Sequence, residues 1–179
     1  VTDNAGCTYD ESHTIAPVTE ISVTGQLISN ITCLGDSDGE IQYTVNNFNT
    51  DYDYTVTGPA NFSGAGETSG TISLNGLAEG TYTITVTDNF TNCTDTANLT
   101  VAAPTAAITA PVTITQPTCL ANGSVSIAAA GGWGSYTYEI TAGPAGYTLP
   151  APQTNGLFAG LNIGGTYTFT VTDANGCVY

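Results

Sequence analysis

The chain has 179 residues, including 33 Thr and 21 Gly but no Lys, Arg or Met, and its net charge is −15. Because it has no cationic side chains, it can neither neutralise phosphates nor be attracted to anionic lipid, so we expect no nucleic-acid partner and no direct membrane insertion. Hydrophobic residues make up 41% of the sequence, which is too many for a disordered acidic tail.

The tripeptide Val-Thr-Asp recurs every 85 residues, starting at positions 1, 86 and 171, and a cysteine follows each copy, at Cys7, Cys93 and Cys177. The other two cysteines, Cys33 and Cys119, lie 86 residues apart (33 to 119). This period predicts the end of one repeat at 1–17, a complete repeat at 18–104, and a second repeat at 105–179 without its last strand. We expect the chain to be a section of a longer tandem array.

Alternation of apolar and polar residues predicts short β-strands, each with one buried face and one Thr-rich face. In chain order they are expected at 41–45, 52–56, 72–74, 81–87, 97–101, 125–129, 136–140, 157–161 and 166–172. Within 157–161 the inward-facing residues are expected to be Leu157, Ala159 and Leu161. Helical periodicity is missing, and Gly, Pro and Asn separate the strands. The predicted fold class is all-β: tandem immunoglobulin-like antiparallel β-sandwich repeats of about 85 residues.

One tyrosine in each repeat follows a Gly-Leu pair near the start of a late strand. Tyr82 comes five residues after Leu77, and Tyr167 comes six residues after Leu161. This pattern is typical of a tyrosine corner, in which the hydroxyl donates to an upstream carbonyl. We expect both tyrosines to be structural.

The cysteines have no histidine cluster beside them, so a zinc site is not expected and an oxidising compartment fits better. About four strand passages separate Cys33 from Cys93, and an even number returns an antiparallel chain to the same end of a sandwich. We therefore predict the disulfides Cys33–Cys93 and Cys119–Cys177. Cys7 would pair with a cysteine of a preceding repeat. Free, buried thiols are the alternative interpretation.

One acidic loop is the strongest candidate for a metal site. Asp36, Asp38 and Glu40 alternate on a glycine-containing loop, which suits a hard cation such as Ca²⁺. A plain acidic turn is the competing interpretation, because the spacing is not that of an EF-hand. The recurring Asp3, Asp88 and Asp173 each precede a tight turn and are expected to form Asx-type turns.

No catalytic constellation is predicted. His13 is the single histidine, expected at an exposed position of a strand at 8–15, and no partner residue can be named for it. Trp133 lies in a Gly-Gly-Trp-Gly loop between strands. It could contact a sugar or a partner protein, or it could cover the end of its own core.

The run Gly-Leu-x-x-Gly-x-Tyr-x-x-x-Val-Thr-Asp-x-x-x-x-Cys at 76–93 resembles the repeats of SprB-type gliding-motility adhesins of Bacteroidetes. Val-Thr-Asp-Ala-Asn-Gly-Cys at 171–177 and the two Thr-Cys-Leu pieces at 32–34 and 118–120 share the resemblance. This sequence departs from a uniform repeat by an insertion at 163–165 and by one extra residue between Asp88 and Cys93.

The resemblance implies a non-catalytic stalk segment of a long adhesin or filament used for surface attachment or gliding motility. It implies export by type IX secretion, attachment to the outer membrane at the cell surface, and neighbouring repeats, surface polysaccharide or lateral copies as partners. In that phylum Asp-Thr followed by a small residue is an O-glycosylation signal, so Thr96 is a candidate site.

Two other classes of function are weighed beside the stalk. A carbohydrate-binding accessory region of a secreted enzyme would be recognised by a catalytic domain in the flanking sequence. An ice-binding surface is suggested by the Thr-x-Thr ladders, although solvent-facing Thr is ordinary on any strand.

Overall fold

The computed structural model describes residues 1–14 and 20–179, and in that part of the chain it has twelve β-strands. None of the described residues forms a helix of the length and apolarity that crossing a membrane requires. The strands are β1 (Ser22–Ser29), β2 (Gly39–Asn46), β3 (Tyr52–Thr57), β4 (Phe62–Glu67), β5 (Thr71–Leu77), β6 (Gly80–Asp88), β7 (Thr94–Val101), β8 (Val112–Thr115), β9 (Gly123–Ile127), β10 (Thr137–Ala142), β11 (Leu157–Leu161) and β12 (Thr168–Thr172).

Strands β1–β7 form two antiparallel sheets, which we call the first sheet pair. The strand orders are β1-β2-β5 and β4-β3-β6-β7. In an immunoglobulin constant-type sandwich the fourth strand pairs with the fifth, whereas here β4 pairs with β3. The two sheets enclose one hydrophobic core, which is consistent with a β-sandwich.

The core of the first sheet pair follows directly from the alternation of its strands. On β6 the side chains of Tyr82, Ile84 and Val86 are fully buried, and the threonines between them face outward. The buried Tyr43 hydroxyl donates a hydrogen bond to the backbone carbonyl of Tyr82 across the two sheets, at 2.9 Å. Gly25 of β1 lies against Leu99 of β7, so the two edge strands pack closely together.

Strands β8–β12 form the second sheet pair, with its own hydrophobic core. The strand orders are β8-β9-β11 and β10-β12, again antiparallel. An isolated bridge between Tyr138 and Gln153 lies where the first sheet pair has the β3–β4 pairing. Among the described residues, the edge of β12 that does not pair with β10 has only one bridge, from Thr172 to Val178.

Corresponding residues of the two sheet pairs have the same strand partners. The equivalent pairings are Gly39 with Leu77 and Gly123 with Leu161, Ile41 with Leu74 and Val125 with Phe158, Val56 with Ile84 and Ile140 with Phe169, and Tyr54 with Val86 and Tyr138 with Val171. The same alternation therefore sets the same register twice.

The inward face of β11 differs from the sequence prediction. Phe158 is buried, whereas Leu157 is 47% exposed and Ala159 faces solvent. The pairing of β11 with β9 has a bulge between Ala159 and Leu161, where Gly160 adopts a φ of 78°. The extra bulge residue breaks the strict alternation, so Phe158 and Leu161 share the buried face.

The strand expected at 8–15 is not formed by the described residues. Thr8 pairs with Thr2 in a short hairpin at residues 1–9, and residues 10–14 have no strand partner. His13 is exposed, and its Nε2 lies 3.0 Å from a carboxylate oxygen of Glu11. Ile15 and Pro17, together with the predicted repeat boundary there, lie outside the described residues.

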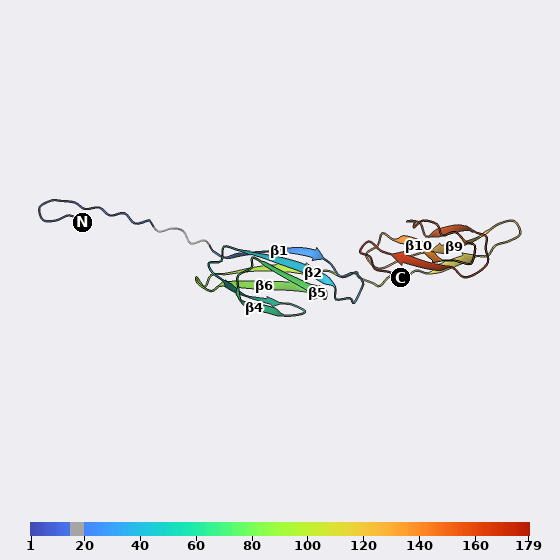
Figure 1. Cartoon of the computed structure of the whole chain (residues 1–179), viewed down its shortest axis with the longest axis horizontal. Helices are drawn as coiled ribbons and strands as arrows, with labels where there is room; N and C mark the ends of the chain where they lie inside the picture. The colour runs from blue at the N-terminus through green and yellow to red at the C-terminus, as the bar shows by residue number, and fades with distance from the viewer. Residues whose placement is uncertain (15–19) are drawn as a thin grey trace.

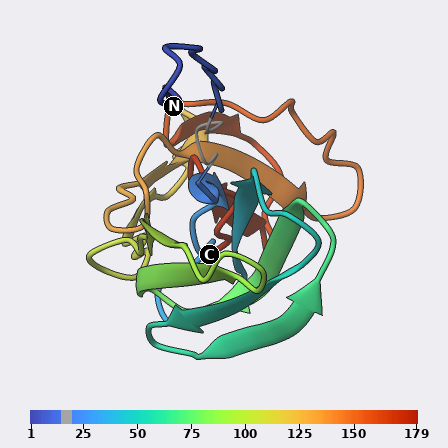
Figure 2. The same ribbon diagram turned by 90° about the vertical axis from the view of Figure 1, so that its left-hand side faces the viewer.

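Figure 1 shows the two sheet pairs one after the other along the longest axis of the molecule, with the N-terminal hairpin beyond the first pair. Figure 2, seen from the N-terminal end, has the second sheet pair behind the first. The site described next lies where the two pairs meet.

Candidate functional site

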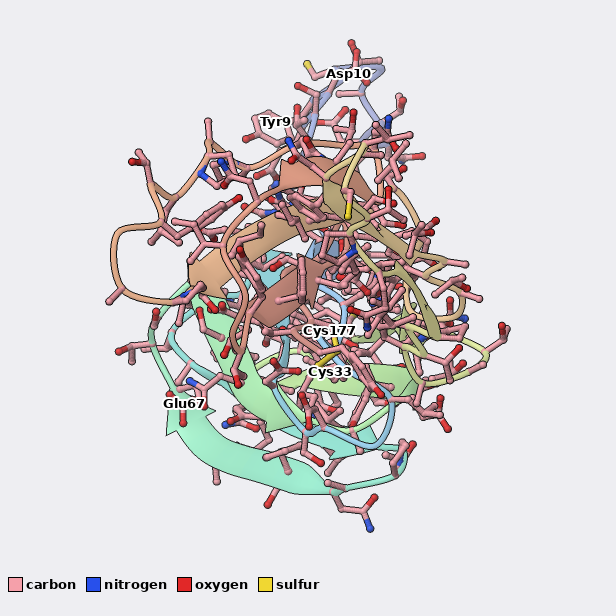
Figure 3. The ribbon with its side chains drawn as sticks, turned by 90° about the vertical axis from the view of Figure 1, so that its right-hand side faces the viewer. Tyr9, Asp10, Cys33, Glu67 and Cys177 are labelled. Carbon is pink, nitrogen blue, oxygen red and sulfur yellow. A yellow bond between two sulfur atoms is a disulfide. The ribbon has the colours of Figure 1, made fainter. Side chains whose placement is uncertain are left out.

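A disulfide joins the two sheet pairs. Cys33 follows β1, Cys177 follows β12, and their Cα atoms lie 5.1 Å apart (Figure 3). The predicted pairings Cys33–Cys93 and Cys119–Cys177 are therefore wrong. Cys7, Cys93 and Cys119 are free thiols.

The number of strands between the cysteines explains this correction. Five strands, β2 to β6, lie between Cys33 and Cys93. Since all of their pairings are antiparallel, an odd number of strands carries the chain to the opposite end of the sheet pair. Cys33 therefore lies at the end that faces the second sheet pair, and Cys93 lies at the far end.

The loop that carries Cys33 is fixed by two carboxylates. Asp36 Oδ2 accepts a hydrogen bond from the backbone N–H of Cys33 at 3.2 Å, and Asp38 Oδ1 accepts one from the backbone N–H of Thr32 at 2.9 Å. The side-chain and backbone hydrogen bonds of Thr32 hold the pKa of Asp38 below its usual value. These acidic residues therefore shape the loop that presents Cys33.

The predicted calcium site is not assembled. In the described part of the chain, no three His, Cys, Asp or Glu side chains come together as metal ligands. Asp36 and Asp38 instead accept hydrogen bonds from their own loop, and Glu40 lies further along on β2. The acidic turn, which was the competing interpretation, describes this loop.

Asp173 organises the other side of the junction. Its Oδ1 accepts hydrogen bonds from the backbone N–H groups of Asn175 and Cys177, at 3.0 and 2.9 Å, and its Oδ2 accepts one from the backbone N–H of Trp133, at 2.8 Å. The carboxyl group is buried, and each of these bonds satisfies a backbone donor. One carboxylate thus positions both Cys177 and Trp133.

Trp133 contacts the first sheet pair rather than leaving a free binding surface. Its indole Nε1–H points at the backbone carbonyls of Ile31 and Thr32, at 3.1 and 3.2 Å. These carbonyls directly precede Cys33, so the indole and the disulfide hold the same loop. Neither interpretation from the sequence describes this contact, because the indole bonds to backbone carbonyls of the preceding sheet pair and not to a sugar, a separate protein or the end of its own core.

The sequence did not identify Asp173 or Ile31 as junction residues. Ile31 participates through its backbone carbonyl, which no side-chain pattern can reveal. Asp173 did carry a signal, because the same Val-Thr-Asp-x-x-x-Cys hairpin occurs twice.

Each Val-Thr-Asp hairpin forms the expected Asx-type turn, in which the aspartate Oδ1 accepts from the backbone N–H two residues further on, at 2.9 Å for Asp3 and Asp88 and 3.0 Å for Asp173. The backbone N–H of the aspartate donates to the carbonyl of the following cysteine at 3.0, 2.9 and 3.0 Å for Asp3, Asp88 and Asp173. In each hairpin the residue before the cysteine has a positive φ, and it is glycine twice and asparagine once: Gly6 (82°), Asn92 (59°) and Gly176 (88°). The local sequence alone therefore builds these hairpins.

Asp88 repeats the role of Asp173 at the far end of the first sheet pair. Its carboxylate accepts from the backbone N–H of Thr91 at 2.7 Å and of Asn49 at 2.6 Å. The hydrogen bond from Thr91 is the main reason why the pKa of Asp88 is lowered. Asn49 thus occupies the position that Trp133 occupies at the junction.

Both predicted tyrosine corners are present. The Tyr82 hydroxyl donates to the carbonyl of Ala78 at 3.1 Å, and the Tyr167 hydroxyl donates to the carbonyl of Ile163 at 2.7 Å. The insertion at 163–165 supplies the acceptor for Tyr167. Both tyrosine hydroxyls are used within their own corner, so the two residues stabilise the fold as expected.

Thr96 is exposed on β7, beside Asp95. Asp95 Oδ2 accepts from the backbone N–H of Val23 on β1 at 2.8 Å, so the acidic residue of the glycosylation signal also fastens two edge strands. The hydroxyl of Thr96 remains accessible for modification.

A cavity of about 350 Å³ opens beside β8 and β9 in the second sheet pair. Its lining includes Gly123, the counterpart of Gly39, and in the first sheet pair Val101 of β7 packs against Gly39. The cavity therefore lies where β7 lies in the first sheet pair, and among the described residues no strand of the second sheet pair covers this place.

Residues 112–145, which run from β8 past β10, match the family of the SprB repeat. The chain carries a SprB-type repeat. The SprB repeat points to a cell-surface, adhesin-like region. No curated protein matches the chain. The first sheet pair lies outside the SprB match, but it has the same strand partners and the same Val-Thr-Asp hairpin.

Proposed function

We propose that this segment is a non-catalytic stalk of a long secreted adhesin or filament, built from tandem immunoglobulin-like repeats of about 85 residues. The observation that carries the proposal is the end-to-end junction, where a disulfide and the Trp133 indole hold one loop from two sides. Two domains that bind separate ligands would need no such joint. A stalk needs one, because bending at each joint would shorten its reach.

The chain between the two sheet pairs supports a stiff joint. On one side Ala102 donates to Asn30 Oδ1 at 2.8 Å, and its carbonyl accepts from Ile31 N–H at 3.3 Å. On the other side the carbonyl of Ala106 accepts from Gly132 N–H at 2.8 Å. The connection is therefore fastened to both sheet pairs and has only three residues, 103–105, between the fastened points.

The finer parts of the proposal rest on the SprB-type repeat. The segment would be exported by type IX secretion, held at the outer membrane and used for surface attachment or gliding motility. Its partners would be neighbouring repeats and, beyond them, surface polysaccharide or lateral copies of itself. The absence of Lys and Arg from the sequence suits an exposed position, because trypsin-like proteases find no cleavage site.

The test uses a doubled chain, in which residues 10–179 follow directly after Tyr179 of a complete chain. Tyr9 and Tyr179 occupy the same hairpin position, so this addition keeps the period. At about 35–45 Å per repeat, small-angle scattering should give a maximum dimension that grows by roughly 70–90 Å on doubling.

A doubled chain that folds back on itself, with no growth in maximum dimension, would contradict the stalk. Specific hydrolysis of polysaccharide by the chain would contradict its non-catalytic role. The matched variant for scattering is Trp133→Phe, which keeps an aromatic ring but removes the indole N–H donor, and it should broaden the distribution of dimensions.

A further inference from the structure

We propose that disulfides join every repeat to the next along the array, so that Cys33–Cys177 is one rung of a continuous ladder. In this ladder the cysteine after the first strand of one repeat binds the hairpin cysteine of the following repeat. The inference rests on the proposed tandem array and specifies how neighbouring repeats are held together.

The five cysteines fall into two kinds. Cys33 and Cys119 follow the first strand of their sheet pair, β1 and β8, whereas Cys7, Cys93 and Cys177 close the Val-Thr-Asp hairpins. The disulfide joins one cysteine of each kind, from two different sheet pairs. The three free cysteines also include both kinds, so each could complete the same bond with a further repeat.

The free cysteines lie at the ends where further repeats would dock. Cys93 is at the end of the first sheet pair away from the second, because five strands separate it from Cys33. In the second sheet pair β9 runs from Cys119 towards Trp133 at the junction, and β12 ends at the junction beside Cys177, so Cys119 is at the end away from Cys177. Cys7 closes the N-terminal hairpin, which precedes the first sheet pair in the chain and lies beyond it in Figure 1. Pairing within one sheet pair would have to join opposite ends.

The end of the first sheet pair that carries Cys93 has the same arrangement of hydrogen bonds around an aspartate as the end of the second sheet pair that carries Cys177. Asp88 holds the Cys93 hairpin and the backbone of Asn49, just as Asp173 holds the Cys177 hairpin and the backbone of Trp133. The side-chain amide of Asn49 can donate hydrogen bonds to backbone carbonyls, as the Trp133 indole does. Asn49 and Trp133 therefore both carry a side chain that can donate a hydrogen bond to a preceding repeat.

Each rung forms by thiol–disulfide exchange with a disulfide oxidant, such as an oxidised thiol oxidoreductase or oxidised glutathione. The Cys119 thiolate attacks the oxidant to give a mixed disulfide and one thiol. The hairpin thiolate then attacks the Cys119 sulfur and releases the second thiol. One protein S–S bond forms, one oxidant S–S bond breaks, and the two protons and two electrons end on the oxidant.

Counting thiols in the doubled chain tests the ladder. The doubled chain has nine cysteines, because only Cys7 is not repeated. After oxidation with oxidised glutathione and unfolding, the ladder leaves three thiols that react with iodoacetamide, the same number as in the single chain. Five reactive thiols would mean that the two copies are not joined by a rung, and one would mean pairing within repeats. Either number overturns the ladder.

Two variants of the first copy in the doubled chain locate the new rung. Cys119→Ser should raise the count from three to four, because it frees Cys93 of the second copy. Cys93→Ser, the matched control, should lower it to two and leave all three disulfides in place. Mass spectrometry after cleavage at Asp and Glu should recover Cys119 joined to the second Cys93, and its recovery joined to any other cysteine would refute the proposal.

The scattering experiment separates this inference from the proposed function. An elongated doubled chain with five free thiols would support the proposed stalk and contradict the disulfide ladder. A compact doubled chain would contradict the extended array on which both the stalk and the ladder depend.

Discussion

In the first sheet pair β6 pairs with β3 on one edge and with β7 on the other, whereas in the second sheet pair β12 has β10 as its only strand neighbour among residues 1–14 and 20–179. Around β7 the packing is tight, and Val101 and Leu99 reach the backbone of Gly39 and Gly25. The corresponding place in the second sheet pair is the 350 Å³ cavity, and nearby Ile114 is 62% exposed. Yet corresponding residues keep the same strand partners in both sheet pairs.

This comparison separates what sets the register from what completes the core. Register follows from the alternation of each strand and its immediate neighbours. It is therefore the same in the second sheet pair, although no described strand there corresponds to β7. Burial depends on the last strand, which covers both sheets at once. The second sheet pair, which has no counterpart of β7 among the described residues, therefore keeps the register but leaves part of its core uncovered.

The largest expected effect comes from shortening a buried side chain in the enclosed core of the first sheet pair. Ile84 is fully buried in the first sheet pair, and Ile84→Ala should lower its free energy of unfolding by about 2–5 kcal/mol. Because the two cores are separate clusters, calorimetry of the reduced chain should show one transition moving and the other unchanged. Equal movement of both transitions would show that the two sheet pairs unfold as one unit.

Two equivalent glycines test the role of the last strand. A methyl group on Gly39 would lie 2.5 Å from Val101 Cγ1, so Gly39→Ala should destabilise the first sheet pair by about 1–3 kcal/mol. A methyl group on Gly123 meets its nearest atom, the Thr115 carbonyl oxygen, at 3.1 Å, so Gly123→Ala should cost less. Urea unfolding measures both. Equal losses at Gly39 and Gly123 would argue against the last strand as the cause.

Alkaline pH should act on the first sheet pair through Tyr43, whose counterpart in the second is Ile127. Burial raises the pKa of Tyr43 from 10.0 to about 12. Its folded-state pKa exceeds its unfolded value, so its contribution is fully present below pH 10 and is lost as the pH rises towards 12. Unfolding curves measured between pH 9 and 12 should show this loss, and Tyr43→Phe should reduce its slope. An unchanged slope would place the alkaline loss at other buried tyrosines.

The smallest expected effect concerns the two tyrosine corners. Tyr82→Phe and Tyr167→Phe each remove one hydroxyl-to-carbonyl hydrogen bond, so each should cost about 1 kcal/mol. Thermal unfolding should show similar losses in the two sheet pairs, since the corner is made within one loop in both. A loss confined to Tyr82 would mean that the insertion at 163–165 weakens the second corner.

Nine of the twelve described strands, the corners and the hairpins could be predicted because each is encoded within a few consecutive residues, whereas β1, β4 and β8 were not among the predicted ranges. The disulfide could not be predicted, because its ends depend on the number of strands between the cysteines. β4, with the sequence Phe-Ser-Gly-Ala-Gly-Glu, has no alternating apolar pattern and was not among the predicted strands. Adding it changes four passages into five and moves Cys93 to the other end.

The inward face of β11 was mispredicted for a related reason. A single bulge at Gly160 changes which residues share a face, and alternation alone does not mark a bulge. The junction contact of Trp133 depends on backbone carbonyls of another sheet pair, which leave no trace in the spacing of side chains.

The Cys33–Cys177 bond also determines how the chain responds to tension. It spans 144 residues, so a pull along the chain passes through the bond and cannot draw those residues out. In a ladder the load would pass from each hairpin cysteine to the next first-strand cysteine, a stretch of 26 residues (7 to 33, and 93 to 119). Fully extended, 26 residues reach about 90 Å.

That length is close to the roughly 70–90 Å that two folded repeats occupy. Two repeats without the bonds could be drawn out to about 600 Å, because all 170 residues of two 85-residue periods would then be loaded. A disulfide-linked array would therefore gain almost no length by unfolding. Under shear at a surface it would act as a tether of nearly constant length.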